Sequence, residues 1–192
     1  MKKILLYGAG GHASSCINII EETKKFKILG LIDKNKKVKK TLFDYNVVGN
    51  DKDLEKLFKR TKYLFYAISH LNSLKDRIKK INFLRKKNFE FPTIISKSAK
   101  IGKNVKIGSG TIIMDNVFIS NNVSIGNYCI INNSTHLDHD VKIKDNCHLS
   151  TSVVINGFCN IGNNCFVGSG SVMINNYKLK ANSFIKMGSI IK

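Results

Sequence analysis

Residues 101–131 read IGKNVKIGSGTIIMDNVFISNNVSIGNYCII, in which every sixth residue is isoleucine. The spacing continues to residue 191, and its sixteen positions hold only aliphatic residues or Met: Ile101, Ile107, Ile113, Ile119, Ile125, Ile131, Leu137, Ile143, Leu149, Ile155, Ile161, Val167, Met173, Leu179, Ile185 and Ile191. A second column, two residues earlier in each hexad, is mostly small or apolar. This period of six fits neither the 3.6 of a helix nor the 2 of a strand. It predicts a parallel β-helix of hexapeptide repeats.

Each hexad is expected to form one short strand and one corner, so that three hexads close a triangular coil of eighteen residues. Residues eighteen apart then stack at roughly 4.8 Å, the strand spacing of a sheet. In five hexads a glycine follows the aliphatic residue, where we expect a tight corner to favour it: Gly102, Gly108, Gly126, Gly162 and Gly168. Four of the five cysteines fall in the small inward column and are predicted to be buried thiols, without metal or disulfide: Cys129, Cys147, Cys159 and Cys165.

The N-terminal third has the pattern of an α/β domain. Residues 2–7 read as a buried strand, and residues 8–13 (GAGGHA) follow as a glycine-rich turn into a helix that extends to about Lys25. A second strand over 28–32 ends in Asp33. A glycine turn at a helix N-terminus presents backbone N–H groups to phosphate, and the acid at the second strand's end completes the form of a dinucleotide fingerprint.

Further helices are predicted over 51–60 and 71–87, with a third strand over 62–68 between them. This is too short for a full two-half dinucleotide fold, so we expect a single Rossmann-like half domain and no NAD. The only proline, Pro92, lies in an extended connector. We therefore expect domains at 1–91 and 92–192.

The formal net charge is +19, yet only three of the 32 basic residues are Arg, and the chain holds 22 Asn. Nucleic-acid readers use Arg heavily, so we expect no nucleic-acid partner, whereas a basic surface attracts polyanionic small ligands. No apolar run approaches the ~18 residues of a membrane helix. We expect no membrane insertion and a cytoplasmic location.

Three histidines lie close together within the hexads. His139 is expected at a corner with Asp140 beside it, whereas His136 and His148 are expected to point out from flat faces. An outward His beside a carboxylate can act as an oriented general base. Gly157, one coil later, would leave space beside the imidazole and expose an N–H group to a developing oxyanion. The plainer alternatives are a solvated His and a corner glycine.

A metal site is not expected, because no His lies two coils from these three, the separation found in hexapeptide-repeat carbonic anhydrases.

The whole chain resembles the sugar acyltransferases that pair a nucleotide-binding domain with a left-handed β-helix. These are the sialic acid O-acetyltransferases and the N-acetyltransferases of UDP-linked 4-amino sugars of the bacillosamine type. The pieces that carry the resemblance are the run Tyr7–Ala13, Ile32-Asp33, Ala67-Ile68 with Arg77, the stretch Ile94–Ile101, and the run Asn132, His139-Asp140, His148 and Asn156-Gly157.

The resemblance implies a direct transfer from acetyl-CoA, with His139 as base, Asp140 as its partner and Gly157 binding the thioester oxygen. It implies that His148 lines the acetyl-CoA site and that Ser169 and Met187 flank the pantetheine. The residues implied to face the nucleotide sugar are Gly8, Gly10, Gly11, His12, Asp33 and Asn132.

We therefore expect an acetyl-CoA-dependent N-acetyltransferase of a nucleotide-linked, UDP-type 4-amino sugar, acting as a homotrimer. Two alternatives stay open. One is O-acetylation of a sialic acid or related sugar, and the other is a catalytically silent trimer that binds a nucleotide sugar.

Overall fold

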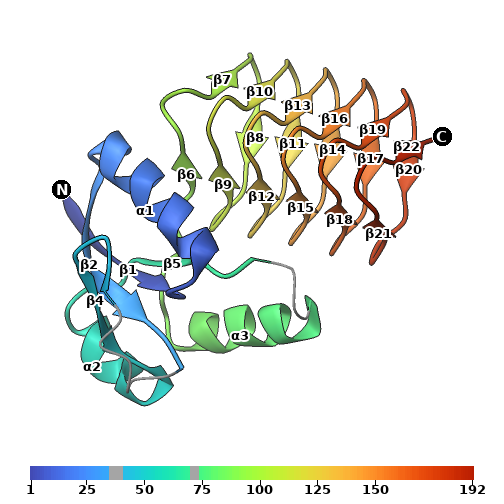
Figure 1. The fold of residues 1–192 in the computed structure, drawn as a ribbon. Helices are drawn as coiled ribbons and strands as arrows, with labels where there is room; N and C mark the ends of the chain where they lie inside the picture. The colour runs from blue at the N-terminus through green and yellow to red at the C-terminus, as the bar shows by residue number, and fades with distance from the viewer. Residues whose placement is uncertain (35–40, 70–73) are drawn as a thin grey trace. The chain divides into compact units, whose positions relative to one another are not determined.

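The computed structural model describes residues 1–34, 41–69 and 74–192, which form two compact units, Met1–Pro92 and Thr93–Lys192. The predicted architecture is confirmed: a Rossmann-like unit precedes a stack of short parallel strands of the left-handed β-helix type (Figure 1). No helix in the described part of the chain is long and apolar enough to cross a membrane.

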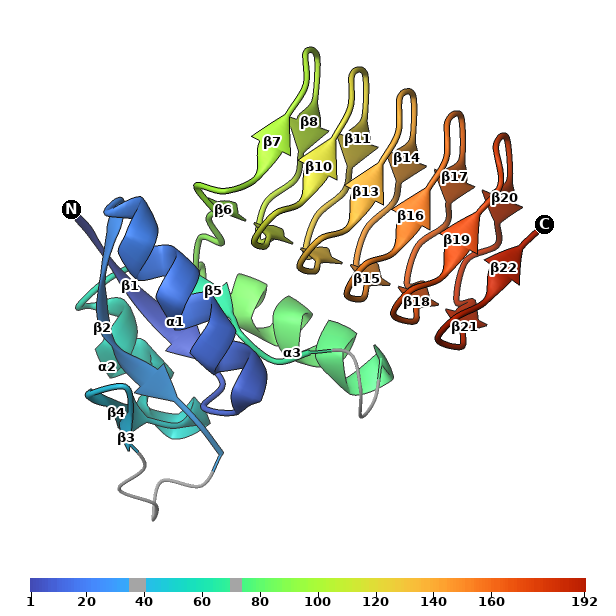
Figure 2. The ribbon, with the colours of Figure 1, turned by 45° about the horizontal axis from the view of Figure 1, so that its top comes forward.

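The N-terminal unit is a five-stranded sheet with the order β3-β4-β2-β1-β5. Its parallel strands are β1 (Lys2–Tyr7), β2 (Phe26–Ile32), β4 (Tyr45–Gly49) and β5 (Leu64–Tyr66), and β3 (Thr41–Leu42) is antiparallel to β4. Helix α1 (Gly11–Thr23) covers one face, and α2 (Leu54–Phe58) and α3 (Leu74–Lys86) cover the other (Figures 1 and 2). Strands enclosed on both faces are continuous apolar runs, as residues 4–7 of β1 are.

The elements of this unit differ in detail from those predicted. Residues 41–49 form two strands that the sequence analysis did not assign. The expected helix over 51–60 is a 3₁₀ turn, η1 (Asp51–Asp53), followed by the short α2. A capping box explains this start, because Asn50 accepts the N–H of Lys52 while the Asp53 carboxylate accepts the N–H of Asn50. The predicted start of the next helix, at 71–73, lies outside the described residues.

The C-terminal unit is a triangular coil of three parallel sheets, in which strands eighteen residues apart pair in register (Figure 2). The strands are β6 (Ile94–Ile95), β7 (Lys100–Ile101), β8 (Lys106–Ile107), β9 (Ile112–Ile113), β10 (Phe118–Ile119), β11 (Ser124–Ile125), β12 (Ile130–Ile131), β13 (His136–Leu137), β14 (Lys142–Ile143), β15 (His148–Leu149), β16 (Val154–Ile155), β17 (Asn160–Ile161), β18 (Phe166–Val167), β19 (Val172–Met173), β20 (Lys178–Leu179), β21 (Phe184–Ile185) and β22 (Ile190–Ile191).

The core of the coil consists of the two columns that the sequence analysis placed inside. From Ile113 to Met173, the aliphatic residue or Met at every sixth position is at most 4% exposed. The four cysteines of the second column are fully buried free thiols. Their sulfurs donate to backbone carbonyls of the next corner, as Cys147 does to Gly162 at 3.0 Å.

The five corners that hold glycine do require a residue without Cβ, as expected, but not because their backbone is left-handed. None of the five has positive φ; the left-handed residue comes two positions later, as at Asn104 (φ 58°) and Asn164 (φ 62°), and Asn is its commonest type along the coil. Asn tolerates this conformation better than most residues. The glycines are needed for close approach, since a Cβ on Gly102 would come within 2.8 Å of the backbone of the next coil.

Two faces of the coil differ in their outward side chains. On the sheet of β8, β11, β14, β17 and β20 these are polar, and we call it the polar face: Lys106, Ser124, Lys142, Asn160 and Lys178. On the sheet of β7, β10, β13, β16, β19 and β22 they are mostly apolar or aromatic, and we call it the apolar face: Lys100, Phe118, His136, Val154, Val172 and Ile190. Phe118 is 40% and Ile190 73% exposed.

Candidate functional site

His139 lies in the turn between β13 and β14, at one edge of the apolar face. Its Nδ1 is 3.0 Å from Oδ2 of Asp140, and its ring meets Phe158 edge-on with 5.0 Å between centroids. Asp140 occupies the left-handed position of the turn, with φ 60°. Because Asp140 is an acceptor, it fixes the tautomer in which Nδ1 carries the proton and Nε2 is free to accept one. The imidazole is 43% exposed, so a substrate can reach it.

Gly157 lies in the next coil, directly beside this imidazole. A Cβ built on it would be 2.8 Å from Cε1 and 2.9 Å from Nε2 of His139. Any larger residue would therefore displace the ring. At several other corners of the coil the corresponding backbone N–H is bound by a side-chain oxygen, as Asp145 N–H is by Asn163 at 3.0 Å. Within the described residues, no acceptor is seen for the N–H of Gly157.

The other edge of the apolar face carries a second set of expected site residues. Asn132 lies in the turn before β13, Ser169 in the turn before β19 and Met187 in the turn before β22. Ser169 Oγ is 2.8 Å from Ser150 Oγ, and Met187 is 80% exposed. Within one chain these residues share an edge with each other and not with His139, Asp140 and Gly157.

His148 precedes the inward Leu149 and lies on the outer side of its strand, as expected, but it is buried there. It is 4% exposed, and its ring lies edge-on to Phe166 with 5.1 Å between centroids. It belongs to the sheet of β12, β15 and β18, whereas His136, stacked on Phe118 at 4.7 Å, lies exposed on the apolar face.

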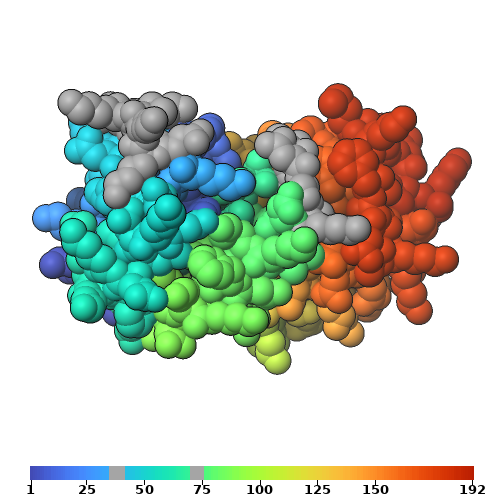
Figure 3. Space-filling model, turned by 90° about the horizontal axis from the view of Figure 1, so that it is seen from below, coloured from blue at the N-terminus to red at the C-terminus, as the bar shows by residue number. Residues whose placement is uncertain are grey.

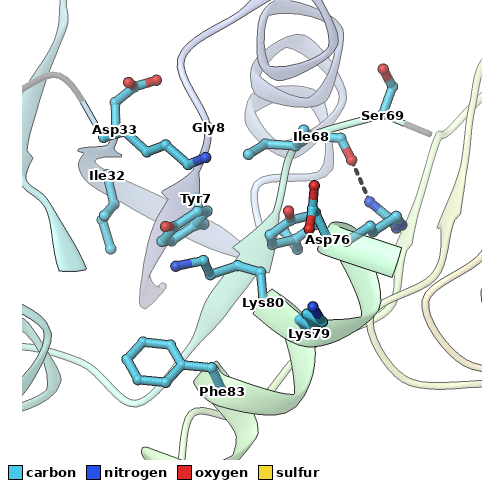
Figure 4. A pocket seen from close by; sticks show the side chains of 13 residues that line it. Tyr7, Gly8, Ile32, Asp33, Ile68, Ser69, Asp76, Lys79, Lys80 and Phe83 are labelled. Atoms are coloured by element: carbon cyan, nitrogen blue, oxygen red, sulfur yellow. Dashed lines mark hydrogen bonds between the residues drawn. The ribbon is translucent and has the colours of Figure 1, made fainter. Parts of the chain in front are cut away.

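The N-terminal unit has a pocket of about 570 Å³ at the carboxyl ends of β1, β2 and β5 (Figure 4). In open α/β sheets this is where ligands bind. Its lining residues come from these strand ends and from α3: Tyr7, Gly8, Ile32, Asp33, Lys34, Tyr66, Ile68, Ser69, Asp76, Arg77, Lys79, Lys80 and Phe83. Four of them are cationic and two are acidic, so the pocket favours an anionic ligand. Figure 3 views the molecule from below, and the residues of α3 are green in it.

A stacked aromatic pair forms the centre of the pocket. The rings of Tyr7 and Tyr66 are 5.5 Å apart and nearly parallel. Lys80 Nζ lies 5.5 Å from the centroid of Tyr7, and the Arg77 guanidinium lies 4.9 Å from that of Tyr66. Arg77 is 3% exposed and donates to the carbonyl of Ile68, the contact dashed in Figure 4.

Asp51 holds two of these groups in place. Its carboxylate accepts the Tyr7 hydroxyl at 2.5 Å and the Lys80 ammonium at 2.6 Å. Burial would raise the pKa of Asp51, but the bonds from Lys80 and Tyr7 outweigh it and lower that pKa. Burial, together with the Asp51 carboxylate, raises the pKa of Tyr7 well above its usual range. Tyr7 is therefore a neutral hydrogen-bonding group in this site.

The expected sugar-binding residues of the glycine turn separate into two sets. Gly8 and Asp33 line the pocket, whereas Gly10, Gly11 and His12 are not among its described lining residues. Gly8 has φ 123°, and a Cβ on it would lie 2.8 Å from the carbonyl oxygen of Ala67. His12 Nε2 is 3.6 Å from Cys16 Sγ. Burial, assisted by the charge of Arg77, lowers the pKa of His12 to about 4.

The sequence analysis gave no role in the pocket to Lys80, Phe83, Asp51 or Tyr66. Their spacing along the chain carries no motif, because they meet only where α3 packs under the strand ends. Among the described residues, no group of three or more His, Cys, Asp or Glu side chains is arranged to hold a metal ion.

A Rossmann-like half domain joined to a hexapeptide coil with a His–Asp corner defines a hexapeptide-repeat acyltransferase. Comparison with protein families agrees, since residues 3–91 match the PglD N-terminal domain and residues 89–191 match the GMPPB C-terminal domain. A comparison with curated protein sequences gives no significant match.

Several solved structures are similar over the whole chain. PerB, the perosamine N-acetyltransferase of Caulobacter crescentus, solved with CoA and GDP-perosamine, is 25% identical with a TM-score of 0.89, covering 100% of this chain and 90% of PerB. The acetyltransferase domain of PglB from Neisseria gonorrhoeae, solved with acetyl-CoA, is 18% identical with a TM-score of 0.88, covering 100% and 91%. At 18% identity, the similarity to PglB shows a shared fold.

Through residues 89–191, more than half of its length, the chain belongs to the GMPPB C-terminal domain family, and with its PglD-type N-terminal domain it belongs to the hexapeptide-repeat nucleotide-sugar acetyltransferases.

Proposed function

We propose that the protein transfers an acetyl group from acetyl-CoA to the amine of a nucleotide-linked amino sugar, with His139 as general base. The observation that carries the proposal is the corner in which Asp140 engages Nδ1 of His139 and Gly157 leaves Nε2 accessible. Support also comes from PerB, whose structure holds CoA and GDP-perosamine in the same fold.

The proposed reaction uses the His139 tautomer in which Nδ1 carries the proton and Nε2 can accept one. The sugar amine attacks the thioester carbonyl carbon, and Nε2 of His139 takes the proton that the nitrogen must lose. Asp140 stabilises the imidazolium that forms, and the N–H of Gly157 faces the oxyanion. When the carbon–sulfur bond breaks, the CoA thiolate takes the proton back from His139, which restores the enzyme. No metal has a step in this scheme.

A homotrimer is part of the proposal, because the residues proposed for one site are divided between the two edges of the apolar face. His139, Asp140 and Gly157 lie along one edge, and Ser169 and Met187 along the other. A cyclic assembly that covers the apolar faces can bring one edge of a copy against the opposite edge of its neighbour. The pantetheine would then lie between copies, beside Ser169 and Met187 of one and His139 of the next. His148 remains a proposed part of the acetyl-CoA site.

The pocket of the N-terminal unit is proposed to hold the nucleotide. Its aromatic pair offers a flat apolar surface, and its lysines and Arg77 suit a diphosphate. Asp33 would accept from a ribose hydroxyl or a base N–H. The sequence resemblance favours UDP, and the similarity to PerB makes a GDP-linked amino sugar an equal first choice.

The test is thiol release from acetyl-CoA against UDP-linked 4-amino sugars, GDP-perosamine and free sialic acids. Turnover with an amino sugar and its mass increase by one acetyl group would support the proposal. Turnover with sialic acid alone would replace it with O-acetylation. Nucleotide-sugar binding without any thiol release would leave the silent binding protein as the better reading.

A further inference from the structure

A second carboxylate faces the reactive side of His139. Asp138 Oδ2 is 3.9 Å from Nε2 of His139, whereas Asp140 engages the opposite nitrogen. The imidazole therefore lies between two carboxylates with different neighbours. The proposed mechanism uses only one of them.

The separation of 3.9 Å defines a gap of useful size. It is too long for a direct hydrogen bond, which needs about 2.7–3.2 Å. A third polar atom about 2.9 Å from both Oδ2 and Nε2 fits between them. An amine nitrogen in that position would touch the base that takes its proton and a carboxylate that balances its charge.

Both sides of the gap are fixed before any ligand arrives. Asp138 Oδ1 accepts the backbone N–H of His139 at 2.7 Å, which leaves Oδ2 directed at the ring. Asp140 and Phe158 hold the imidazole, as described above. Asp138 is 36% exposed at its side chain, so a substrate can reach it.

The fold itself does not call for an acid at this position. Ser120 and Asn156 occupy the same place in the coils before and after Asp138. Of the residues that directly follow an inward aliphatic from 102 to 192, Asp138 is the only one with an acidic side chain. At this hexad position, a negative charge therefore occurs only in the coil that carries the base.

We propose that Asp138 binds the sugar amine through Oδ2 and makes the site select an amine over a hydroxyl. The inference rests on the proposed function. A bound ammonium carries a positive charge, and a neutral amine acquires one as it attacks the carbonyl carbon, before its proton passes to Nε2. A neutral hydroxyl gains far less from the carboxylate. Charge-assisted hydrogen bonds of this kind are roughly twice as strong as neutral ones.

The experiment compares Asp138→Asn with wild type on two matched ligands. One is GDP-perosamine or a UDP-linked 4-amino sugar, whichever the wild type acetylates, and the other is its 4-hydroxy counterpart used as a competitive inhibitor. Asn keeps an oxygen for the His139 N–H, so the turn is preserved. Asp145→Asn is the control, because it removes one carboxylate from another corner while keeping an acceptor for Asn127 N–H.

We expect Asp138→Asn to raise the amine KM by roughly tenfold or more, the loss of a partly exposed charge-assisted bond. The inhibition constant of the hydroxy sugar and the KM for acetyl-CoA should stay unchanged, and Asp145→Asn should match wild type. An unchanged amine KM, or an equal rise in both constants, would overturn the role of Asp138 and leave the proposed function standing. Failure of the wild type to acetylate any amine would overturn both.

Discussion

At the scale of single residues, the chemistry of the corner depends on which imidazole nitrogen is free. Asp140 engages Nδ1 at 3.0 Å, and Gly157 leaves the space beside Nε2 open. The sequence could predict that His139 and Asp140 share a corner, because their hexad positions place them there. It could not predict that Asp138 Oδ2 lies 3.9 Å from Nε2, because that distance depends on the rotamers of neighbouring side chains in one turn.

Replacing the base should affect turnover more than binding. We expect His139→Ala to lower kcat roughly 10²–10⁴-fold, the usual contribution of a positioned base, with little change in the KM for acetyl-CoA. Asp140→Ala should cost less, because Asp140 acts only through the imidazole. Steady-state kinetics on the acetylated amino sugar measures both. Near-native turnover of the His139 variant would contradict the assignment.

His12 predicts a pH dependence of stability that is separate from catalysis. Its folded-state pKa is about 4 against an ordinary 6.5, because burial and Arg77 disfavour the charged form. Between these values the unfolded chain binds a proton that the folded chain does not, so stability falls as pH drops through this window, by at most about 3 kcal/mol. The fall begins near pH 6.5 and ends near the folded pKa.

The measurement is the thermal midpoint of wild type and His12→Gln across that window. The variant has no ionisable group at the position, so its midpoint should fall less with pH than that of the wild type. Parallel curves for the two proteins would show that His12 is not held neutral in the folded state.

At the scale of elements, the hexads were readable from the sequence because every coil repeats the same two inward columns. The left-handed position repeats as regularly in the backbone, but its residue type varies among Asn, Gly, Ser and others, so the sequence does not mark it. The strands over 41–49 were missed because they are short and lie at the sheet edge. The pocket residue Lys80 and its hydrogen-bond partner Asp51 are 29 residues apart, and only the packing of α3 joins them.

The turn between β1 and α1 offers a matched pair of glycines. Gly8 has φ 123° and no room for a Cβ, whereas Gly10 has φ −102° and nothing within 4 Å of its Cβ position. We expect Gly8→Ala to destabilise the N-terminal unit by roughly 1–3 kcal/mol and Gly10→Ala to leave it nearly unchanged. Thermal unfolding of both variants tests this, and equal midpoints would show that the turn relaxes around the added methyl group.

At the scale of the whole molecule, the polar face and the apolar face of the coil predict different roles. Exposed apolar residues that form a contiguous stripe mark interaction surfaces. On the apolar face, Val154 and Val172 continue such a stripe between His136 and Ile190. The polar face carries Lys, Ser and Asn, as expected for a surface in water. A partner that covers the apolar face would complete the site at each of its edges.

The proposed trimer would use the same face for assembly and for activity. Val172→Glu places a charge within the apolar face, one strand in from β22, and an unpaired charge buried at an interface costs several kcal/mol. We expect it to convert a trimer into monomers and to abolish acetyl transfer, because each His139 would lose the opposite edge. Asn160→Glu adds the same charge to the polar face and should change neither property. Light scattering and thiol release on both variants decide the matter: a trimeric, active Val172 variant, or a wild type that is already monomeric at micromolar concentration, would exclude this face as the interface.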